Sequence, residues 1–294
     1  MYLFDLHCDT LSRCIQKSEP LAFATGHISL ERGSRYARWG QVFAVFVPDN
    51  LQGQAAADYA DGAMEFYRCQ KRIIKQVCGP ILAVENGNSL AGDLHRLDVF
   101  AERGVRIFTL TWNGANELGH GAHCDPALGL TDFGKAAVKR MFKLGIIPDV
   151  SHLNEAGFWD VAALSDTHKK PFWATHSNCS SIHRHPRNLS DGQLRAIFAC
   201  GGLAGINLFT DFLGGAGTAR DVGLHLEHML ELGGEDHVAL GSDFDGCGIH
   251  PSLAGIELLE VLDSELERFG FTDTQRKKFF WSNAAKTLAN PPRI

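Results

Sequence analysis

Short apolar runs rich in β-branched residues recur along the chain, and amphipathic stretches separate them. Runs of this length and composition are typical of buried strands. The pattern predicts eight strands: YLFDLHCD from Tyr2, QVFAVFV from Gln41, PILAVE from Pro80, VRIFTLTW from Val105, GIIPDVSH from Gly145, PFWATH from Pro171, GLAGINLF from Gly202 and HVALGSDFD from His237.

Helical periodicity fills several of the intervals, in DFGKAAVKRMFKLG, NEAGFWDVAALSD, SDGQLRAIFACGG and ARDVGLHLEHMLELGG. Several of these stretches begin at an Asn, Asp or Ser cap and end at Gly. Parallel strands need helical crossovers, and a closed barrel leaves no free edge, so the alternation predicts a single (β/α)8 TIM-like barrel as one domain over residues 1–294. An open doubly wound sheet is the alternative, ranked lower because no Gly-rich phosphate loop follows the first strand.

The C-terminal part of the chain predicts two more helices. The first carries one apolar face made of Leu259, Leu262, Leu266 and Phe269. Thr272 and Gln275 then have capping-box spacing before the last helix, TQRKKFFWSNAAKTLA. The longest irregular stretches, residues 11–40 and the segment from Asn113, are expected to be loops that cover an active-site mouth.

Composition and charge narrow the class of partner. The chain has 294 residues, of which 45% are hydrophobic and 21% charged, and its net charge is −6. These values are ordinary for a globular protein, and no long run of one charge occurs. A small or neutral substrate is therefore expected, rather than nucleic acid or a membrane.

Targeting signals and cysteine spacing indicate the compartment. No stretch reaches the ~20 apolar residues that cross a bilayer, and the N-terminus lacks a signal-peptide pattern, so we expect a cytoplasmic protein. The eight cysteines are scattered without a CxxC pair. Free thiols are therefore expected, and a cysteine-bound zinc is not.

Six polar residues lie at the ends of predicted strands: His7, Asp9, Glu85, His152, His176 and Asp243. In a barrel of this kind the chemistry sits at the carboxyl ends of the strands. In a strand, His7 and Asp9 would point to the same face. Taken singly, His152 and His176 could be core histidines, and Asp245 competes with Asp243 for a role at the turn. Taken together, the six predict a shared site.

Imidazoles combined with carboxylates suit zinc or a similar divalent ion, and one carboxylate can bridge two ions. Two metals that share a water would lower its pKa and polarise a carbonyl group. A further carboxylate could take the proton and return it to a leaving amine. The residues therefore predict metal-assisted hydrolysis.

The motifs DLHCDT, LAVENGNS, FTLTW, PDVSH, ATHSN, HPRNLSD and LGSDFDG resemble, in order and spacing, those of the membrane (renal) dipeptidase family, the M19 peptidases. The resemblance runs from residue 4 to about residue 285. It implies a TIM-like barrel of the metal-dependent hydrolase type with two zinc ions, although other divalent ions also fit.

By position, the resemblance assigns His7 and Asp9 to one zinc, His152 and His176 to the other, and Glu85 to a bridge between them. Asp243 becomes the catalytic acid/base that serves the bridging hydroxide. Arg187 in HPRN matches the family arginine that pairs with the substrate carboxylate, a role suited to a planar fork of donors.

The chain also departs from the family pattern. Trp112 stands where the mammalian enzyme has a histidine after TLT, and NGNS replaces the common GGHS. The Trp112 indole can donate a hydrogen bond but cannot accept a proton. Asn113, Asn116 and His120 are alternatives for the missing group, and we expect Trp112 and Asn113 at the substrate.

The resulting hypothesis is a zinc-dependent dipeptidase that cleaves small dipeptides, including those with a C-terminal D-residue, and that forms a homodimer. One alternative is another binuclear-metal hydrolase such as a lactonase or deaminase. Another is a degenerate metal-binding member of the family with weak activity.

Overall fold

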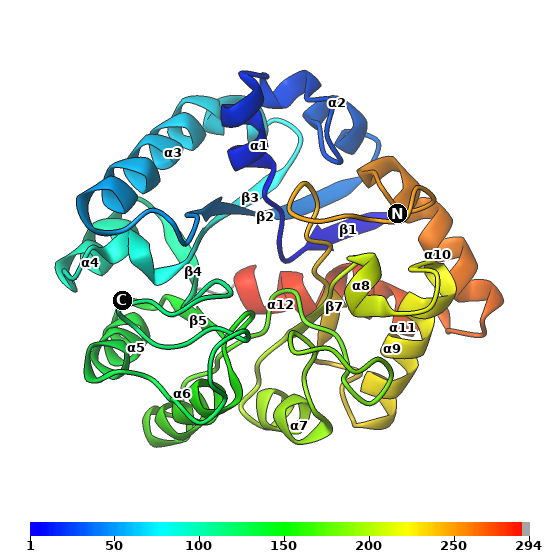
Figure 1. Cartoon of the computed structure of the whole chain (residues 1–294). Helices are drawn as coiled ribbons and strands as arrows, with labels where there is room; N and C mark the ends of the chain where they lie inside the picture. Colours follow the sequence, from blue (N-terminus) through cyan, green and yellow to red (C-terminus); the bar gives the residue numbers. More distant parts are fainter. Residues whose placement is uncertain (290–294) are drawn as a thin grey trace.

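Among the residues that the structure describes, seven parallel strands form one curled sheet, and helices surround it (Figure 1). The computed structural model describes residues 1–289. The order of the strands across the sheet is β5-β4-β3-β2-β1-β7-β6. Their bounds are β1 Tyr2–Asp5, β2 Arg38–Phe46, β3 Gly79–Glu85, β4 Val105–Thr109, β5 Ile147–Asp149, β6 Ala204–Ile206 and β7 Val238–Leu240.

The predicted strand at Pro171 is the one that the sheet lacks. Residues 171–176 make only single parallel bridges, from Trp173 to Asp149 of β5 and from Ala174 to Ala204 of β6. This segment thus lies between the two edge strands of the sheet. The parallel α/β architecture is confirmed, whereas a complete eight-stranded barrel is not.

The helices are α1 Thr10–Lys17, α2 Leu30–Gly33, α3 Gly53–Ile74, α4 His95–Glu102, α5 Asp132–Leu144, α6 Glu155–His168, α7 Asp191–Ala199, α8 Thr210–Leu213, α9 Ala219–Glu231, α10 Leu259–Arg268, α11 Asp273–Lys277 and α12 Asn283–Ala289. The predicted caps are present: the side chain of Asn154 caps α6, Ser190 and Gln193 form a capping box on α7, and Gly145 ends α5 in the left-handed conformation. The expectation that residues 11–40 are irregular was wrong. This segment contains most of α1 and all of α2.

The C-terminal helices differ from the expectation in two details. Helix α10 buries Leu259, Leu262 and Leu266, but Phe269 stands at its C-cap and is 44% exposed. The last predicted helix is divided, because a π-helical turn over Lys278–Ser282 separates α11 from α12. Residues 290–294, the end of the predicted domain, lie outside the described residues.

The hydrophobic core has two parts. The larger part lies between the sheet and the surrounding helices. A smaller part fills the inside of the curl, and α12 closes it by adding Ala284 and Leu288 to Phe4, Val42 and other strand residues. Helix α12 (red) is accordingly seen in the middle of the ring in Figure 1.

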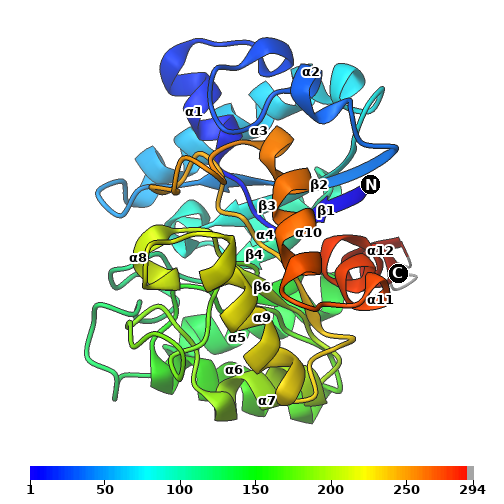
Figure 2. The ribbon, with the colours of Figure 1, turned by 90° about the vertical axis from the view of Figure 1, so that its right-hand side faces the viewer.

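Because all the strands run in parallel, their carboxyl ends meet at one edge of the sheet. Figure 2 shows the N-terminus, α11 and α12 on one side of the molecule and the loops that follow the strands on the opposite side. Within residues 1–289, no helix has the length and apolar character needed to cross a bilayer. All eight cysteines are free thiols, as predicted.

Candidate metal centre

The six polar residues predicted from the strand ends come together on the loop side of the sheet. They are buried side chains that come from the ends of β1, β3, β5 and β7 and from the segment between β5 and β6: His7, Asp9, Glu85, His152, His176 and Asp243. β1 ends at Asp5, so His7 and Asp9 follow the strand and do not lie within it. Cys8 instead forms a single parallel bridge to Phe244, and its neighbours on both sides still face the cluster.

Glu85 lies at the middle of the cluster and offers one oxygen to each half. Its Oε2 is 3.2 Å from Nε2 of His7, which is itself 3.8 Å from Oδ2 of Asp9. Its Oε1 is 3.0 Å from Nε2 of His152 and 3.9 Å from Nε2 of His176. Two triads that share Glu85 therefore have ligand atoms within 4.8 Å of one another, close enough to hold a metal ion between them.

Several buried ligand atoms have no hydrogen-bond partner among residues 1–289. These atoms are Nε2 of His7, Oδ1 of Asp9 and Oε2 of Glu85. His7 and Glu85 are close, but their orientation does not make a hydrogen bond. Leaving a buried polar atom unpaired costs about 1–3 kcal/mol. A bound divalent ion would satisfy all three atoms, so the residues present fit such a group.

The environment keeps two of the histidines neutral. Burial, together with the Arg187 guanidinium, lowers the pKa of His152 to about 4. Burial and the neighbouring His7 hold the pKa of His176 well below its usual value. Neutral imidazole is the form that binds metals.

The carboxyl groups of the cluster repel one another. Burial and the Glu85 carboxylate raise the pKa of Asp9 to about 7, and burial raises the pKa of Asp243. Burial also acts to raise the pKa of Glu85, but His7 and His152 outweigh it and hold that pKa well below its usual range. Burial lowers the pKa of His7, but the Glu85 and Asp9 carboxylates raise it well above its usual value. A divalent cation would offset the repulsion of these acids.

Asp243 stands beside the two triads without belonging to either of them. A methyl group at Gly246 would clash with both Oδ2 of Asp9 and Oδ1 of Asp243, so the two carboxylates flank that glycine closely. The competing residue Asp245 accepts hydrogen bonds from the Thr10 hydroxyl at 2.6 Å and from the His27 amide at 2.6 Å. Asp245 therefore anchors its loop.

Two residues of the cluster have backbone conformations that side chains rarely adopt. His152 has φ +72° and Asp243 has φ +60°. Each such conformation costs roughly 1–3 kcal/mol, and strained residues of this kind cluster at active sites. The fold thus holds these two side chains in place against a backbone preference.

A cavity of about 680 Å³ opens above the cluster. Asp9, Glu85, His152 and Asp243 face it, while His7 and His176 do not. Its apolar wall is formed by aromatic side chains, namely Phe46, Trp112, Phe209 and Phe212. The cavity has room for a ligand of dipeptide size beside the triads.

The two residues predicted at the substrate both reach this cavity. The Trp112 indole packs edge-on against Phe46, with ring centroids 5.2 Å apart. Asn113 also lines the cavity, but its Oδ1 accepts a hydrogen bond from Nδ1 of His152 at 2.9 Å. Asn113 is therefore positioned to orient the ring of His152, a candidate metal ligand. Asn116 turns away to Asn86 and to the backbone.

Arg187 is buried in a neighbouring hollow of about 320 Å³ rather than on the wall of the main cavity. Its guanidinium lies 5.3 Å over the ring of Phe212, which belongs to that wall. Its Nε has no hydrogen-bond partner, and no carboxylate in the described part of the chain forms an ion pair with it. Burial lowers the pKa of Arg187 to about 10, within the range in which it stays charged at neutral pH.

Three supporting residues were missed from the sequence: Asp149, Thr175 and Asn207. Asn207 donates to Asp243, and Thr175 contacts Asp149 and two of the histidines. Thr175 adjoins His176, and Asp149 precedes His152 by three positions, in the motifs ATHSN and PDVSH. The sequence signal that could have identified them is a polar residue at the end of an otherwise apolar strand.

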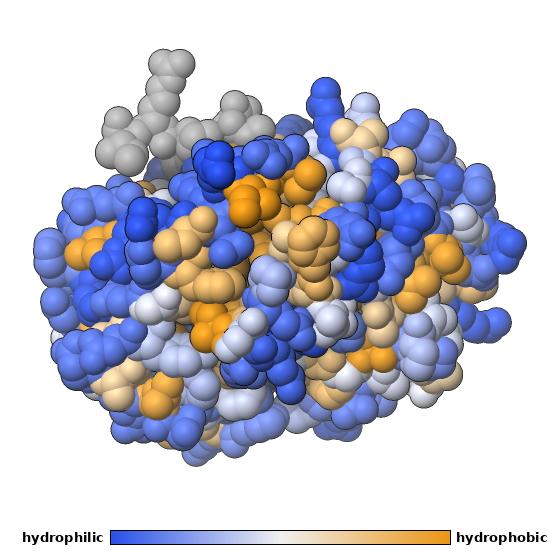
Figure 3. Space-filling model, turned by 90° about the horizontal axis from the view of Figure 1, so that it is seen from above, coloured by the Kyte–Doolittle hydropathy of each residue, from blue (hydrophilic) through white to orange (hydrophobic). Residues whose placement is uncertain are grey.

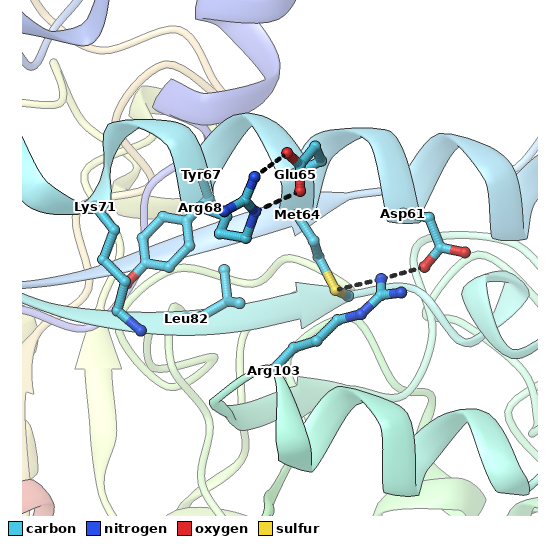
Figure 4. A pocket seen from close by; sticks show the side chains of 8 residues that line it. All are labelled: Asp61, Met64, Glu65, Tyr67, Arg68, Lys71, Leu82 and Arg103. Atoms are coloured by element: carbon cyan, nitrogen blue, oxygen red, sulfur yellow. Dashed lines mark hydrogen bonds and ion pairs between the residues drawn. The ribbon is translucent and has the colours of Figure 1, made fainter.

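A hollow of about 280 Å³ beside α3 has no comparable chemistry. Figure 4 shows that four of its charged side chains form two pairs, Arg68 with Glu65 and Arg103 with Asp61. The fifth, Lys71, lies over the ring of Tyr67. Every group of three side chains within residues 1–289 that could hold a metal ion lies at the centre described above.

A further hollow, between α1 and α3, is mainly apolar. Ile15, Tyr59 and Phe66 line it, and its volume is about 640 Å³. Figure 3, which views the molecule from the side of α1, α2 and α3, shows apolar residues gathered in the middle of this face.

Comparison with known proteins gives consistent results. The sequence model of the membrane dipeptidase family, peptidase family M19, matches residues 64–290. An uncharacterised Klebsiella pneumoniae protein from the 5′ region of pqqA is 34% identical over 78% of this chain and 86% of its own length. The crystal structure of the metallopeptidase dipeptidase AC has a TM-score of 0.89 and 29% identity, covering 99% of this chain and 98% of its own. A Rhodobacter sphaeroides metallopeptidase, liganded with a phosphinate mimic of the dipeptide L-Ala-D-Ala, has a TM-score of 0.89 and 28% identity over 99% of each chain.

Proposed function

Because the chain belongs to the membrane dipeptidase family, peptidase family M19, we propose that it is a zinc-dependent dipeptidase that hydrolyses the peptide bond of small dipeptides. The observation that carries the proposal is the pair of buried triads that share Glu85, with Asp243 beside them and a cavity above. The Rhodobacter sphaeroides relative, which was liganded with a mimic of L-Ala-D-Ala, supports dipeptides with a C-terminal D-residue as substrates.

In this proposal, His7 and Asp9 hold one zinc ion, His152 and His176 hold the other, and Glu85 contacts both. The unpartnered atoms of His7, Asp9 and Glu85 support this assignment. When bound, such ions lower the pKa of water and polarise the scissile carbonyl group. Mixed histidine and carboxylate ligands favour zinc among the common divalent ions.

Asp243 is proposed as the proton carrier. It faces the cavity next to Asp9, and its Oδ2 is held by Asn207 at 2.9 Å, which leaves Oδ1 able to act. A carboxylate at this position would take a proton from the attacking water and pass it to the leaving amine nitrogen.

Arg187 is proposed to bind the C-terminal carboxylate of the substrate. A buried guanidinium that lacks an anionic partner is costly, and a carboxylate would satisfy it with charge-assisted hydrogen bonds. The aromatic ring of Phe212 lies against the guanidinium and also lines the main cavity, so a ligand in the cavity could reach from the cluster toward Arg187.

The proposal is tested by assaying a panel of L,L and L,D dipeptides with zinc-loaded and zinc-free protein. Cleavage that depends on zinc is expected. Asp243→Asn should lower kcat by about 10²–10⁴-fold, the usual contribution of general acid–base catalysis, without changing the zinc content. Asp9→Asn should lose zinc as well as activity. Absence of cleavage across the panel by zinc-loaded protein would contradict the proposal.

A further inference from the structure

The hydroxyl group of Thr175 contacts a histidine of each triad, on the side of the rings that faces away from Glu85. Thr175 is fully buried next to His176. Its Oγ1 is 2.8 Å from Nδ1 of His176 and 3.3 Å from Nδ1 of His7. One hydroxyl therefore contacts one histidine of each triad, on the ring nitrogen that faces away from Glu85.

Asp149 fixes the direction of this hydroxyl. Oδ2 of Asp149 accepts hydrogen bonds from the Thr175 and Thr109 hydroxyls, each at 2.6 Å. Its Oδ1 accepts from the amides of Ser151 at 3.0 Å and of Thr175 at 2.9 Å. Four donors saturate the carboxylate, so Asp149 acts as an anchor although it lies near His7 and His176.

The single hydrogen of the Thr175 hydroxyl is therefore committed to Asp149, and its oxygen lone pairs face the two imidazoles. Because this oxygen has no further hydrogen to donate, it can only accept hydrogen bonds from the imidazoles. Nδ1 of His176 and Nδ1 of His7 must therefore each carry a hydrogen. In a neutral imidazole, the lone pair then lies on Nε2. Nε2 is the atom that each ring directs into the triads.

His152 shows the same arrangement with a different partner. Its Nδ1 donates to Oδ1 of Asn113, so its lone pair also lies on Nε2. The Nε2 atoms of His152 and His176 are 2.8 Å apart. Both rings thus direct Nε2 to the same point, which is consistent with ligation of one ion by both rings.

We infer that Thr175, anchored by Asp149, is a positioning residue that sets the metal-binding tautomer of His7 and His176 and so acts on both halves of the centre. The inference rests on the metal centre proposed above. Thr175 is itself closely confined, because a methyl group at Gly205 or at Gly241 would clash with its carbonyl oxygen. Removing the hydroxyl should therefore leave the backbone in place while releasing both rings.

Three variants test the inference by zinc affinity, measured on metal-free protein at pH 7.5 in competition with a chromophoric chelator. Thr175→Val keeps the shape of the side chain and removes the hydroxyl. Its zinc affinity should fall by about 10–100-fold, the usual effect of losing a group that orients a ligand. Thr175→Ser should restore most of it. Thr109→Val is the matched control, because it removes an equal hydrogen bond to Asp149 without touching a histidine.

A second readout needs no variant of Thr175. Long-range ¹H–¹⁵N spectra of metal-free, histidine-labelled protein report which ring nitrogen carries the hydrogen, and His176→Gln assigns the signal of His176. We expect hydrogen on Nδ1 and none on Nε2. The opposite tautomer would overturn this inference but not the metal centre. The same holds for a Thr175→Val variant that binds zinc as tightly as wild type. It also holds for a Thr109→Val variant that loses as much zinc affinity as Thr175→Val. Wild-type protein that binds no zinc would overturn the metal centre as well.

Discussion

Asn207 donates a hydrogen bond from its Nδ2 to Oδ2 of Asp243 over 2.9 Å. Asn207 is in turn held by Asn178, which accepts from its amide at 2.8 Å and donates to its carbonyl oxygen at 3.0 Å. The carboxylate of Asp243 is therefore fixed by a buried chain of amides that starts on the neighbouring loop. This arrangement supports Asp243 as the proton carrier.

Asn207→Leu should lower kcat for dipeptides by about 10–100-fold, because a hydrogen bond to a charged group contributes roughly 1.5–3 kcal/mol. The bond to Asn207 also lowers the pKa of Asp243, against the raising effect of burial. Its loss should raise that pKa, so the acidic limb of the kcat/KM profile should move to higher pH. The measurement is the pH profile of the zinc-loaded variant.

Zinc content is the control for this variant, because Asn207 contacts no proposed metal ligand side chain. An unchanged acidic limb at unchanged zinc content would show that Asn207 does not act through Asp243. A loss of zinc would indicate a structural effect instead.

Arg187→Met should lower kcat/KM for dipeptides by about 10–100-fold, the effect of losing one charge-assisted contact with the substrate carboxylate. Dipeptide amides, which lack that carboxylate, should be cleaved equally by the variant and by wild type. Steady-state kinetics with matched free-acid and amide substrates measure the difference.

The nearby Arg184 is the matched control, because it is an exposed arginine of the same loop. Arg184→Met should retain the preference for the free acid. If Arg187→Met kept that preference too, Arg187 would not bind the carboxylate.

His225 makes the stability of the fold sensitive to acid. It is fully buried, accepts a hydrogen bond from the Cys179 amide at 3.1 Å, and bonds the Leu213 carbonyl oxygen at 3.0 Å through its other nitrogen. Burial lowers its pKa from the usual 6.5 to about 4. Between these values the unfolded chain binds the extra proton, so stability is present above pH 6.5 and is lost as the pH falls toward 4.

His225→Gln removes this titration while keeping one acceptor and one donor. Between about pH 7.5 and 4, the wild type should lose about 3 kcal/mol more free energy of unfolding than the variant. Denaturant unfolding at the two pH values measures the difference. His95→Gln, at an exposed histidine, is the control and should follow the wild type. An equal loss of unfolding free energy in wild type and in His225→Gln would contradict the assignment of this acid sensitivity to His225.

The order of the elements could be predicted from the sequence, because buried parallel strands and capped helices have local signatures. Seven of the eight predicted strands form, and Asn154, Ser190 and Thr272 cap helices where expected. The segment at Pro171 has strand composition, but it pairs only at Trp173 and Ala174. Whether this segment pairs as a strand depends on the positions of the two flanking strands. A local sequence pattern carries no information about those positions.

The candidate site, too, could be predicted from the sequence only in part. Ligand-type residues stand out at the ends of apolar runs, so the cluster around Glu85 could be predicted. The role of Thr175 could not, because it depends on Asp149 and His7, which meet it only in the folded chain. The left-handed backbone of His152 likewise has no signature in the sequence.

The most direct test of the proposed metal centre is an anomalous difference map from crystals of the zinc-loaded protein, recorded at the zinc absorption edge. We predict two peaks, one bounded by His7, Asp9 and Glu85 and the other bounded by Glu85, His152 and His176. A map with no peak between Asp9 and His176 would contradict it.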